Sequence, residues 1–196
     1  SGPVVIIECA AHVDPTEELA TVLASASGIT DTAVATDPAR RDHLVRFRDR
    51  MTEAIAAAAS ADRTPTFKLD VAVPLHAVGA LLDAAERAAD RDGATLIAFG
   101  HLAEGNLHLN HLRASDTTRI ADTVLAEVAR LGGTISAEHG IGVAKSAWLS
   151  LIRSDGDLAA QRSIRAALDP RGIMNPGVLA SGSGRGDVQV PQLQVP

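Results

Sequence analysis

The chain has 196 residues, of which 46% are hydrophobic and 21% charged, a composition typical of a soluble globular protein with one sizeable core or two small ones. Its formal net charge of -6 argues against nucleic acid as a partner, because phosphate binding requires a basic surface. The single cysteine excludes an intramolecular disulfide, and no uncharged apolar run approaches the roughly 20 residues that span a bilayer. We therefore expect a cytoplasmic protein, with peripheral association at a membrane as an alternative.

The first sixty residues alternate short β-branched runs with amphipathic stretches. The β-branched runs predict two strands, over 4–10 and 32–36, and Cys9 in the first of them is expected to be a small core residue. The amphipathic stretches predict two helices, over 15–27 and 38–61. Each helix begins with Asp-Pro, in which the aspartate is the N-cap and the proline takes the first helical position.

The next part of the chain predicts strand, helix, strand, strand and helix, over 66–73, 74–91, 95–99, 107–112 and 117–131. This order is the split βαβ pattern of ferredoxin-like folds, in which helices cover one face of an antiparallel sheet. Further helices are expected around Trp148, read as a core residue, and over 158–168. The predicted fold class is therefore α+β, a ferredoxin-like sheet followed by C-terminal helices.

Two histidines flank a tight turn in the segment GHLAEGNLHLN, residues 100–110. If Glu104 and Gly105 form a two-residue hairpin loop, His101 faces His108 across the ladder with Cβ atoms roughly 5 Å apart. That spacing suits a shared divalent ion. A slip of the loop by one residue would pair His101 with Asn110 instead, and an ordinary hairpin with two surface or core histidines explains the spacing equally well.

A second chemically suggestive segment, SAEHGIG, covers residues 136–142. Its Glu138 and His139 are adjacent and stand close to glycines, so that His139 is the best candidate for a general base. The alternative is a helix N-terminus at which Glu138 merely favours the helix dipole. The remaining histidines have no convergent partners and are interpreted as surface residues: His12, His43, His76 and His111.

Two basic residues could bind a carboxylate. Arg48 is expected on the apolar side of a helix and Lys68 in the middle of a strand, and these side chains offer a bidentate fork and a point charge respectively. Thr52 follows Arg48 by one helical turn and would lie beside it. The alternative is that both cations are solvated or paired with their acidic neighbours Asp49 and Asp70.

Five motifs in a fixed order support a family resemblance: RDRMT, KLDVAVP, GHLAEGNLHLN, SAEHGIG and LDPRGIMNPG, at 48–52, 68–74, 100–110, 136–142 and 168–177. Together they resemble the C-terminal cap domain of FAD-linked oxidases of the vanillyl-alcohol oxidase superfamily. This group includes D-lactate and D-2-hydroxyglutarate dehydrogenases and the glycolate oxidase FAD subunit. The resemblance implies a cap domain over 1–179, followed by a flexible tail over 180–196.

The resemblance implies a divalent metal, zinc or manganese, held by His101, His108 and Glu138. The hydroxyl and carboxylate of a 2-hydroxy acid would complete its coordination, and metal binding would acidify the hydroxyl. By the same resemblance, His139 takes the hydroxyl proton while hydride leaves C2 for the flavin.

Further residues match positions that the family uses for binding. Arg48, Thr52, Lys68 and Asn110 match positions that hold or lie near the substrate, and Asn175 matches a position near the flavin. The family also carries an N-terminal FAD-binding domain, and no Gly-rich pyrophosphate loop of that domain is recognisable here. The isolated chain is therefore expected to be inactive and to have an FAD-binding domain as its partner, with a homodimer as a candidate assembly.

Two other functions remain open at this point. One is the cap of an enzyme similar to alkyl-dihydroxyacetonephosphate synthase, which shares the superfamily but catalyses different chemistry. The other is a metal-binding module without catalysis. The intact ligand set and the pair of cations, Arg48 and Lys68, favour the 2-hydroxyacid dehydrogenase.

Overall fold

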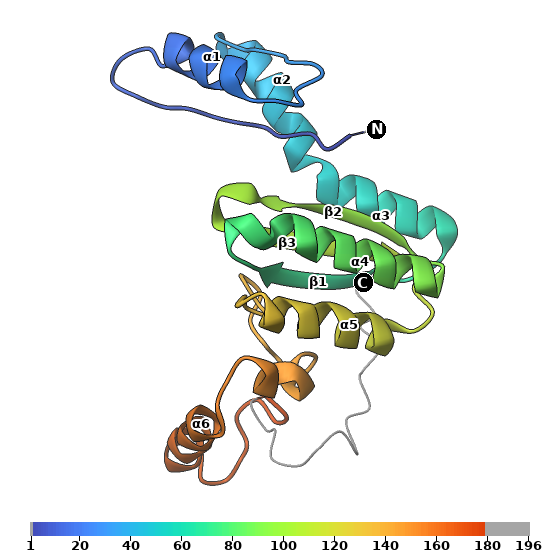
Figure 1. The fold of residues 1–196 in the computed structure, drawn as a ribbon. Helices are drawn as coiled ribbons and strands as arrows, with labels where there is room; N and C mark the ends of the chain where they lie inside the picture. Colours follow the sequence, from blue (N-terminus) through green and yellow to red (C-terminus); the bar gives the residue numbers. More distant parts are fainter. Residues whose placement is uncertain (1, 179–196) are drawn as a thin grey trace. The chain divides into compact units, whose positions relative to one another are not determined.

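The computed structural model describes residues 2–178 (Figure 1). The chain divides into two compact units, with the boundary between Ala54 and Ile55. The predicted tail over 180–196 lies outside the described residues, and the single domain over 1–179 stays a prediction.

The N-terminal unit contains α1 (Thr16–Ser25) and α2 (Pro38–Asp49), and α3 (Met51–Asp62) crosses the boundary between the units. The N-cap of α2 forms as predicted, because the side chain of Asp37 accepts a hydrogen bond from the amide of Arg40 at 3.0 Å. The prediction of one helix over 38–61 was wrong. Arg50, with a φ of -87° and a ψ of -1°, is a turn residue that divides this stretch into α2 and α3.

The two strands predicted in this unit do not form. Residues 4–10 and 32–36 have no regular secondary structure, and Cys9 is exposed rather than part of a core. A β-branched run favours extended backbone, but a strand also needs a neighbouring strand to accept its hydrogen bonds. The described part of the N-terminal unit contains no sheet that could supply one.

The C-terminal unit is built on a three-stranded antiparallel sheet of β1 (Phe67–Ala72), β2 (Thr95–His101) and β3 (Asn106–Leu112), in the order β1-β3-β2. The third strand therefore lies between the first two, as in a split βαβ unit. At the free side of β1, Ala72 and Thr134 form a single bridge. The amide nitrogen of Ala72 lies 3.1 Å from the carbonyl oxygen of Thr134, and that of Thr134 lies 2.8 Å from the carbonyl oxygen of Ala72. This bridge occupies the position of the fourth strand of a ferredoxin-like sheet.

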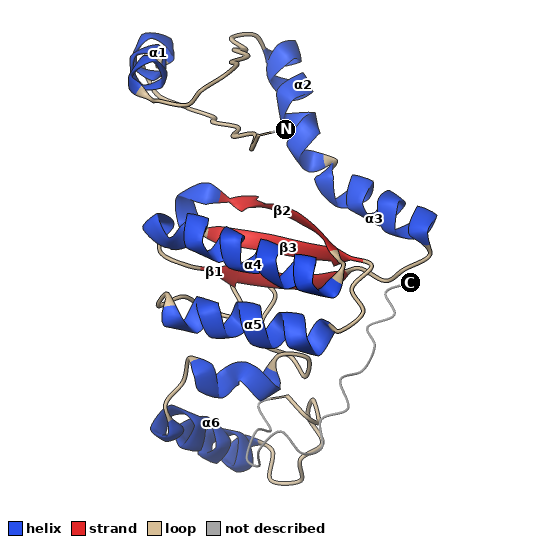
Figure 2. Ribbon diagram, turned by 45° about the vertical axis from the view of Figure 1, so that its right-hand side comes forward, coloured by secondary structure: helices blue, strands red, loops and turns tan. Residues whose placement is uncertain are grey.

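Two helices cover one face of the sheet, α4 (Val78–Asp92), which follows the short 3-10 helix η1 (Leu75–Ala77), and α5 (Thr117–Arg130) (Figure 2). Their buried sides pack on alternate residues of β1 and β3 in one hydrophobic core, which includes Leu81, Ala85, Val124, Leu125, Leu69, Val71, Leu107 and Leu109. The predicted α+β class and the helix-covered antiparallel sheet are confirmed.

His111 also faces these helices, because it alternates with Asn110 along β3 and shares a face with Leu109. Its prediction as a surface residue was wrong: the side chain is fully buried, and neither ring nitrogen has a hydrogen-bond partner. Burial lowers the pKa of His111 to about 4, so the imidazole is neutral in the folded protein. The other three histidines interpreted as surface residues are exposed: His12, His43 and His76.

The last helical elements among residues 2–178 are η3 (Ser146–Leu151), a 3-10 helix, and α6 (Asp155–Leu168). Trp148 is buried, as predicted, and its indole N–H donates to the carboxylate of Asp122 on α5 at 2.8 Å. Ser154 and Asp157 form a capping box at the start of α6. None of the helices in residues 2–178 combines the length and the apolar character needed to cross a membrane.

Candidate metal and substrate site

The second face of the sheet, turned away from α4 and α5, carries four of the nine site residues that the sequence singled out: His101, His108, Lys68 and Asn110. Strand pairing arranges its side chains in three rows across β1, β3 and β2. The rows are Ala72, Asn106 and His101; Asp70, His108 and Phe99; and Lys68, Asn110 and Ile97.

The hairpin between β2 and β3 differs from the prediction. His101 pairs with Asn106, not with His108 or Asn110, and the loop has four residues instead of two. Leu102 to Glu104 form a 3-10 turn, η2, and Gly105 closes it at a φ of 65°. The amide of Gly105 donates to the carbonyl of Leu102 at 3.0 Å, so the turn is stabilised from within.

The two imidazoles nevertheless lie on one face of the sheet. Asn106 is opposite His101, and His108 is two residues further along the same strand, so all three side chains point to one side. The ring centroids of His101 and His108 are 6.0 Å apart. A diagonal pair therefore replaces the predicted direct pair without separating the rings.

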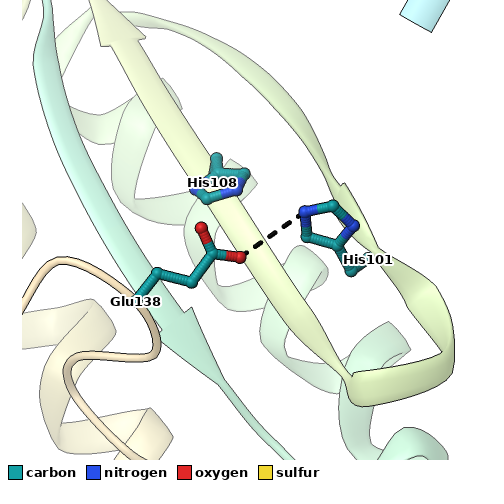
Figure 3. Close-up of side chains that lie close together, drawn as sticks. All are labelled: His101, His108 and Glu138. Atoms are coloured by element: carbon teal, nitrogen blue, oxygen red, sulfur yellow. Dashed lines mark ion pairs between the residues drawn. The ribbon is translucent and has the colours of Figure 1, made fainter.

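Glu138 reaches this pair from a loop that follows α5 (Figure 3). Its Oε1 accepts a hydrogen bond from Nδ2 of Asn106 at 2.6 Å and lies 3.5 Å from Nε2 of His101. One donor atom each from His101, His108 and Glu138 lie within 4.8 Å of one another. Two imidazoles and one carboxylate suit zinc or manganese, so the donor set fits the divalent metal that the resemblance implies.

The bend that carries Glu138 and His139 is fixed by a buried carboxylate on β1. Oδ2 of Asp70 accepts hydrogen bonds from the backbone amides of Glu138, at 2.7 Å, and His139, at 3.0 Å. The alternative prediction of a helix start at this point was wrong, because both residues lie in a bend and the next helical element begins at Ser146.

His139 lies beside the cluster. Its exposed ring stacks on that of His108, with centroids 5.8 Å apart and an interplanar angle of 24°. Its Nδ1 is 4.0 Å from Oδ2 of Asp70. An accessible imidazole next to a carboxylate can accept a proton from a bound molecule.

Asp70 is ionised in this environment. Burial alone would raise its pKa, but the amide hydrogen bonds from Glu138 and His139 and the positive charge of Lys145 outweigh burial, so that the pKa is below its ordinary value. The ammonium of Lys145 is partly buried, which lowers its pKa, and it donates to the carbonyls of Asp70, at 2.8 Å, and Ile135, at 2.7 Å.

Lys68 and Asn110 occupy the row next to His108. Lys68 is exposed, whereas Asn110 is buried and its Nδ2 donates to the carbonyls of Ile97 and His108, both at 3.2 Å. The side-chain amide group of Asn110 thus donates its hydrogen bonds to backbone carbonyls. Substrate binding by these two residues stays a prediction.

Three predicted binding residues do not belong to the strands of the sheet. Arg48 and Thr52 belong to the N-terminal unit, and Nε and Nη2 of Arg48 donate to Oδ1 of Asp49 at 2.9 and 2.8 Å. Asn175 follows α6 with a φ of 43°, and its carbonyl accepts from Nη2 of Arg165 at 3.0 Å. Their roles toward substrate and flavin stay predictions.

Three residues of the site were not singled out as site residues in the sequence: Asp70, Asn106 and Lys145. Strand alternation could have identified two of them, because Asp70 is two residues from Lys68 and Asn106 is two residues from His108. No local pattern marks Lys145, whose contacts depend on how the loop folds back onto β1.

Comparison with known proteins identifies the family of the chain. The family model described as FAD linked oxidases, C-terminal domain, matches residues 4–179. The chain belongs to this family. As a member of the FAD linked oxidase C-terminal family, it is similar to three curated proteins that illustrate the range of names among its relatives.

The D-2-hydroxyglutarate dehydrogenase of Xanthomonas citri pv. viticola is 36% identical over 164 residues, which cover 77% of this chain and 33% of the relative. The mitochondrial D-2-hydroxyglutarate dehydrogenase of Danio rerio is 31% identical, covering 78% and 28%. Glycolate oxidase subunit GlcD of Bacillus subtilis is 32% identical, covering 65% and 29%. The chain thus spans about a third or less of the length of these relatives.

Proposed function

We propose that this chain is the substrate- and metal-binding domain of an FAD-dependent D-2-hydroxyacid dehydrogenase, which oxidises a 2-hydroxy acid to a 2-oxo acid. The observation that carries the proposal is the convergence of His101, His108 and Glu138 beside His139. Similarity to proteins named D-2-hydroxyglutarate dehydrogenase and glycolate oxidase subunit supports the substrate class.

The site residues have three different roles: metal binding, substrate binding and proton transfer. His101, His108 and Glu138 hold a divalent cation, zinc or manganese. Lys68 attracts the carboxylate of the substrate, because it lies exposed on the same face of the sheet, in the row next to His108. His139 accepts the proton of the 2-hydroxyl group.

The remaining chemistry comes from bound groups. FAD, held by a further domain, would supply the hydride acceptor, and the cation would supply the positive charge that acidifies the hydroxyl group. His139 would take the proton of the 2-hydroxyl group, and the cofactor would accept the hydride, so that the alcohol carbon would become a carbonyl.

Zinc occupancy tests the central part of this proposal. The chain should bind one zinc ion in elemental analysis and calorimetric titration. His101→Ala and His108→Ala each remove one of three protein ligands, and each should weaken zinc binding at least about tenfold.

The matched control is His76→Ala, which removes an exposed imidazole of η1 that is not part of the cluster. It should keep the zinc affinity of the parent chain. Full zinc occupancy in both His101→Ala and His108→Ala would show that the cation binds elsewhere.

A further inference from the structure

We propose that Asp70 is the positioning residue of the metal site, one carboxylate that holds both the loop bearing Glu138 and the ring of His108. The inference rests on the proposed function and adds a role for a residue that lies outside the cation's ligand set. Asp70 is well suited to such a role because it is buried in β1, opposite His108 on the neighbouring strand β3.

The first contact is with the loop. Oδ2 of Asp70 accepts the amides of Glu138 and His139, two consecutive residues that carry a ligand and the candidate base. A carboxylate that accepts two backbone N–H groups makes strong charge-assisted hydrogen bonds. The position of the backbone at 138–139 over the sheet is therefore fixed by a single side chain.

The second contact is with a ligand side chain. Oδ1 of Asp70 lies 3.4 Å from Nδ1 of His108, and it has no hydrogen-bond partner although it is buried. A proton on Nδ1 facing this oxygen leaves Nε2 with its lone pair for a cation. The same carboxylate thus favours the tautomer of His108 that can bind metal.

Neighbouring groups keep Asp70 itself in place. Lys145 donates to the backbone carbonyl of Asp70 and to that of Ile135, which ties β1 to the start of the loop. Asn106 holds the other end of Glu138 by donating to its carboxylate. Glu138 is consequently fixed at its backbone by Asp70 and at its tip by Asn106.

Two substitutions separate the two contacts. Asp70→Ala removes both. Asp70→Asn keeps an oxygen that can accept the amides of Glu138 and His139, but it places an NH2 group opposite Nδ1 of His108 and so favours the tautomer that cannot bind through Nε2. We expect both variants of the 196-residue chain to bind zinc at least about tenfold more weakly than the parent.

Amide hydrogen exchange, measured without metal, gives an independent readout of the loop. The amides of Glu138 and His139 should be protected in the parent chain and in Asp70→Asn, and they should lose protection in Asp70→Ala. A purely structural role for Asp70 would instead lower overall stability in both variants. Asp70→Asn would then not combine weaker zinc binding with normal amide protection.

Asp92→Asn is the matched control. The side chain of Asp92 is also unexposed and accepts two backbone amides, from Ser115 and Asp116, and Asp92 precedes β2 at the end opposite His101. This variant should keep the parent's zinc affinity and its protection at 138–139. Zinc affinity that is unchanged in both Asp70 variants would overturn the proposal, as would protection that is unchanged in Asp70→Ala.

The two proposals can fail separately. If the parent chain binds no zinc, the proposed metal function fails, and amide exchange alone decides the role of Asp70. Selective loss of protection at Glu138 and His139 in Asp70→Ala would then support the positioning role, and equal protection would overturn it. If the parent binds zinc and the Asp70 variants bind it equally well, only the positioning role fails.

Discussion

At the scale of single residues, position within a strand decides the chemistry of each histidine. His108 and His111 belong to the same strand, yet one faces the polar side of the sheet and the other faces the helices. The sequence predicted the role of His108 because a second histidine and a turn stand beside it. His111 lacks such a partner in sequence, and strand alternation alone could have revealed its burial.

Burial of His111 should make the stability of the protein depend on pH. The unfolded chain binds a proton near pH 6.5, whereas the folded protein binds it only near pH 4. Stability is therefore fully present above pH 6.5 and is lost as the pH falls toward 4, by about 3 kcal/mol. In His111→Leu this part of the pH dependence should disappear, as measured by urea unfolding between pH 7 and pH 4.

His76→Leu serves as the control, because the side chain of His76 is exposed. It should retain the steep loss of stability found in the parent chain. A His111→Leu variant that loses as much stability over this range as the parent would show that another group is responsible.

At the scale of secondary structure, the hairpin between β2 and β3 shows what a sequence can and cannot predict. Both strands follow from the alternating pattern. His101 and His108 share a face of the sheet whether the loop between the strands has two residues or four. Loop length does not follow, because it depends on a tertiary contact: the carbonyl of Gly105 accepts the amide of Val73, outside the hairpin. That contact favours the four-residue loop over the two-residue loop.

Gly105→Ala should therefore destabilise the protein more than an ordinary glycine substitution. A Cβ at this position would lie 1.9 Å from the carbonyl oxygen of Val73, and the backbone φ of 65° disfavours any residue with a side chain. We expect a loss above about 2 kcal/mol in thermal or urea unfolding, together with weaker zinc binding because the turn carries His101.

Gly132→Ala is the matched control, since its φ of 73° is similar and no atom lies within 4 Å of an added Cβ. It should cost only about 1 kcal/mol, because of the left-handed backbone, and leave zinc affinity unchanged. Equal losses in the two variants would mean that the contact with Val73 does not determine the hairpin.

At the scale of the whole molecule, the sequence predicted the C-terminal unit better than the N-terminal one. Periodicity, helix caps and glycines predict the order of helices and strands from β1 to α5, and the structure contains each of these predicted elements. The strands expected over 4–10 and 32–36 failed because the prediction could not test for a pairing partner. Convergence of Glu138 with the hairpin likewise depends on Asp70 and Lys145, which no local pattern links to it.

The chain spans only about a third of the length of relatives named as dehydrogenases, so its activity should require more than these 196 residues. The isolated chain should show no flavin absorption and form no 2-oxo acid from D-lactate, glycolate or D-2-hydroxyglutarate with an artificial electron acceptor. The chain combined with an FAD-binding domain should do both. A yellow, catalytically active isolated chain would contradict this expectation.

The proposed metal ligands come from two segments, the hairpin and the loop after α5, and this separation in sequence has a thermodynamic consequence. An ion that binds His101, His108 and Glu138 together recognises the folded chain alone, since the unfolded chain does not bring them into one place. By mass action, a hundredfold excess of such an ion over its dissociation constant adds about 2.7 kcal/mol to the free energy of unfolding. The concentration of available metal would thus determine how strongly the loop that carries Glu138 is held against the sheet.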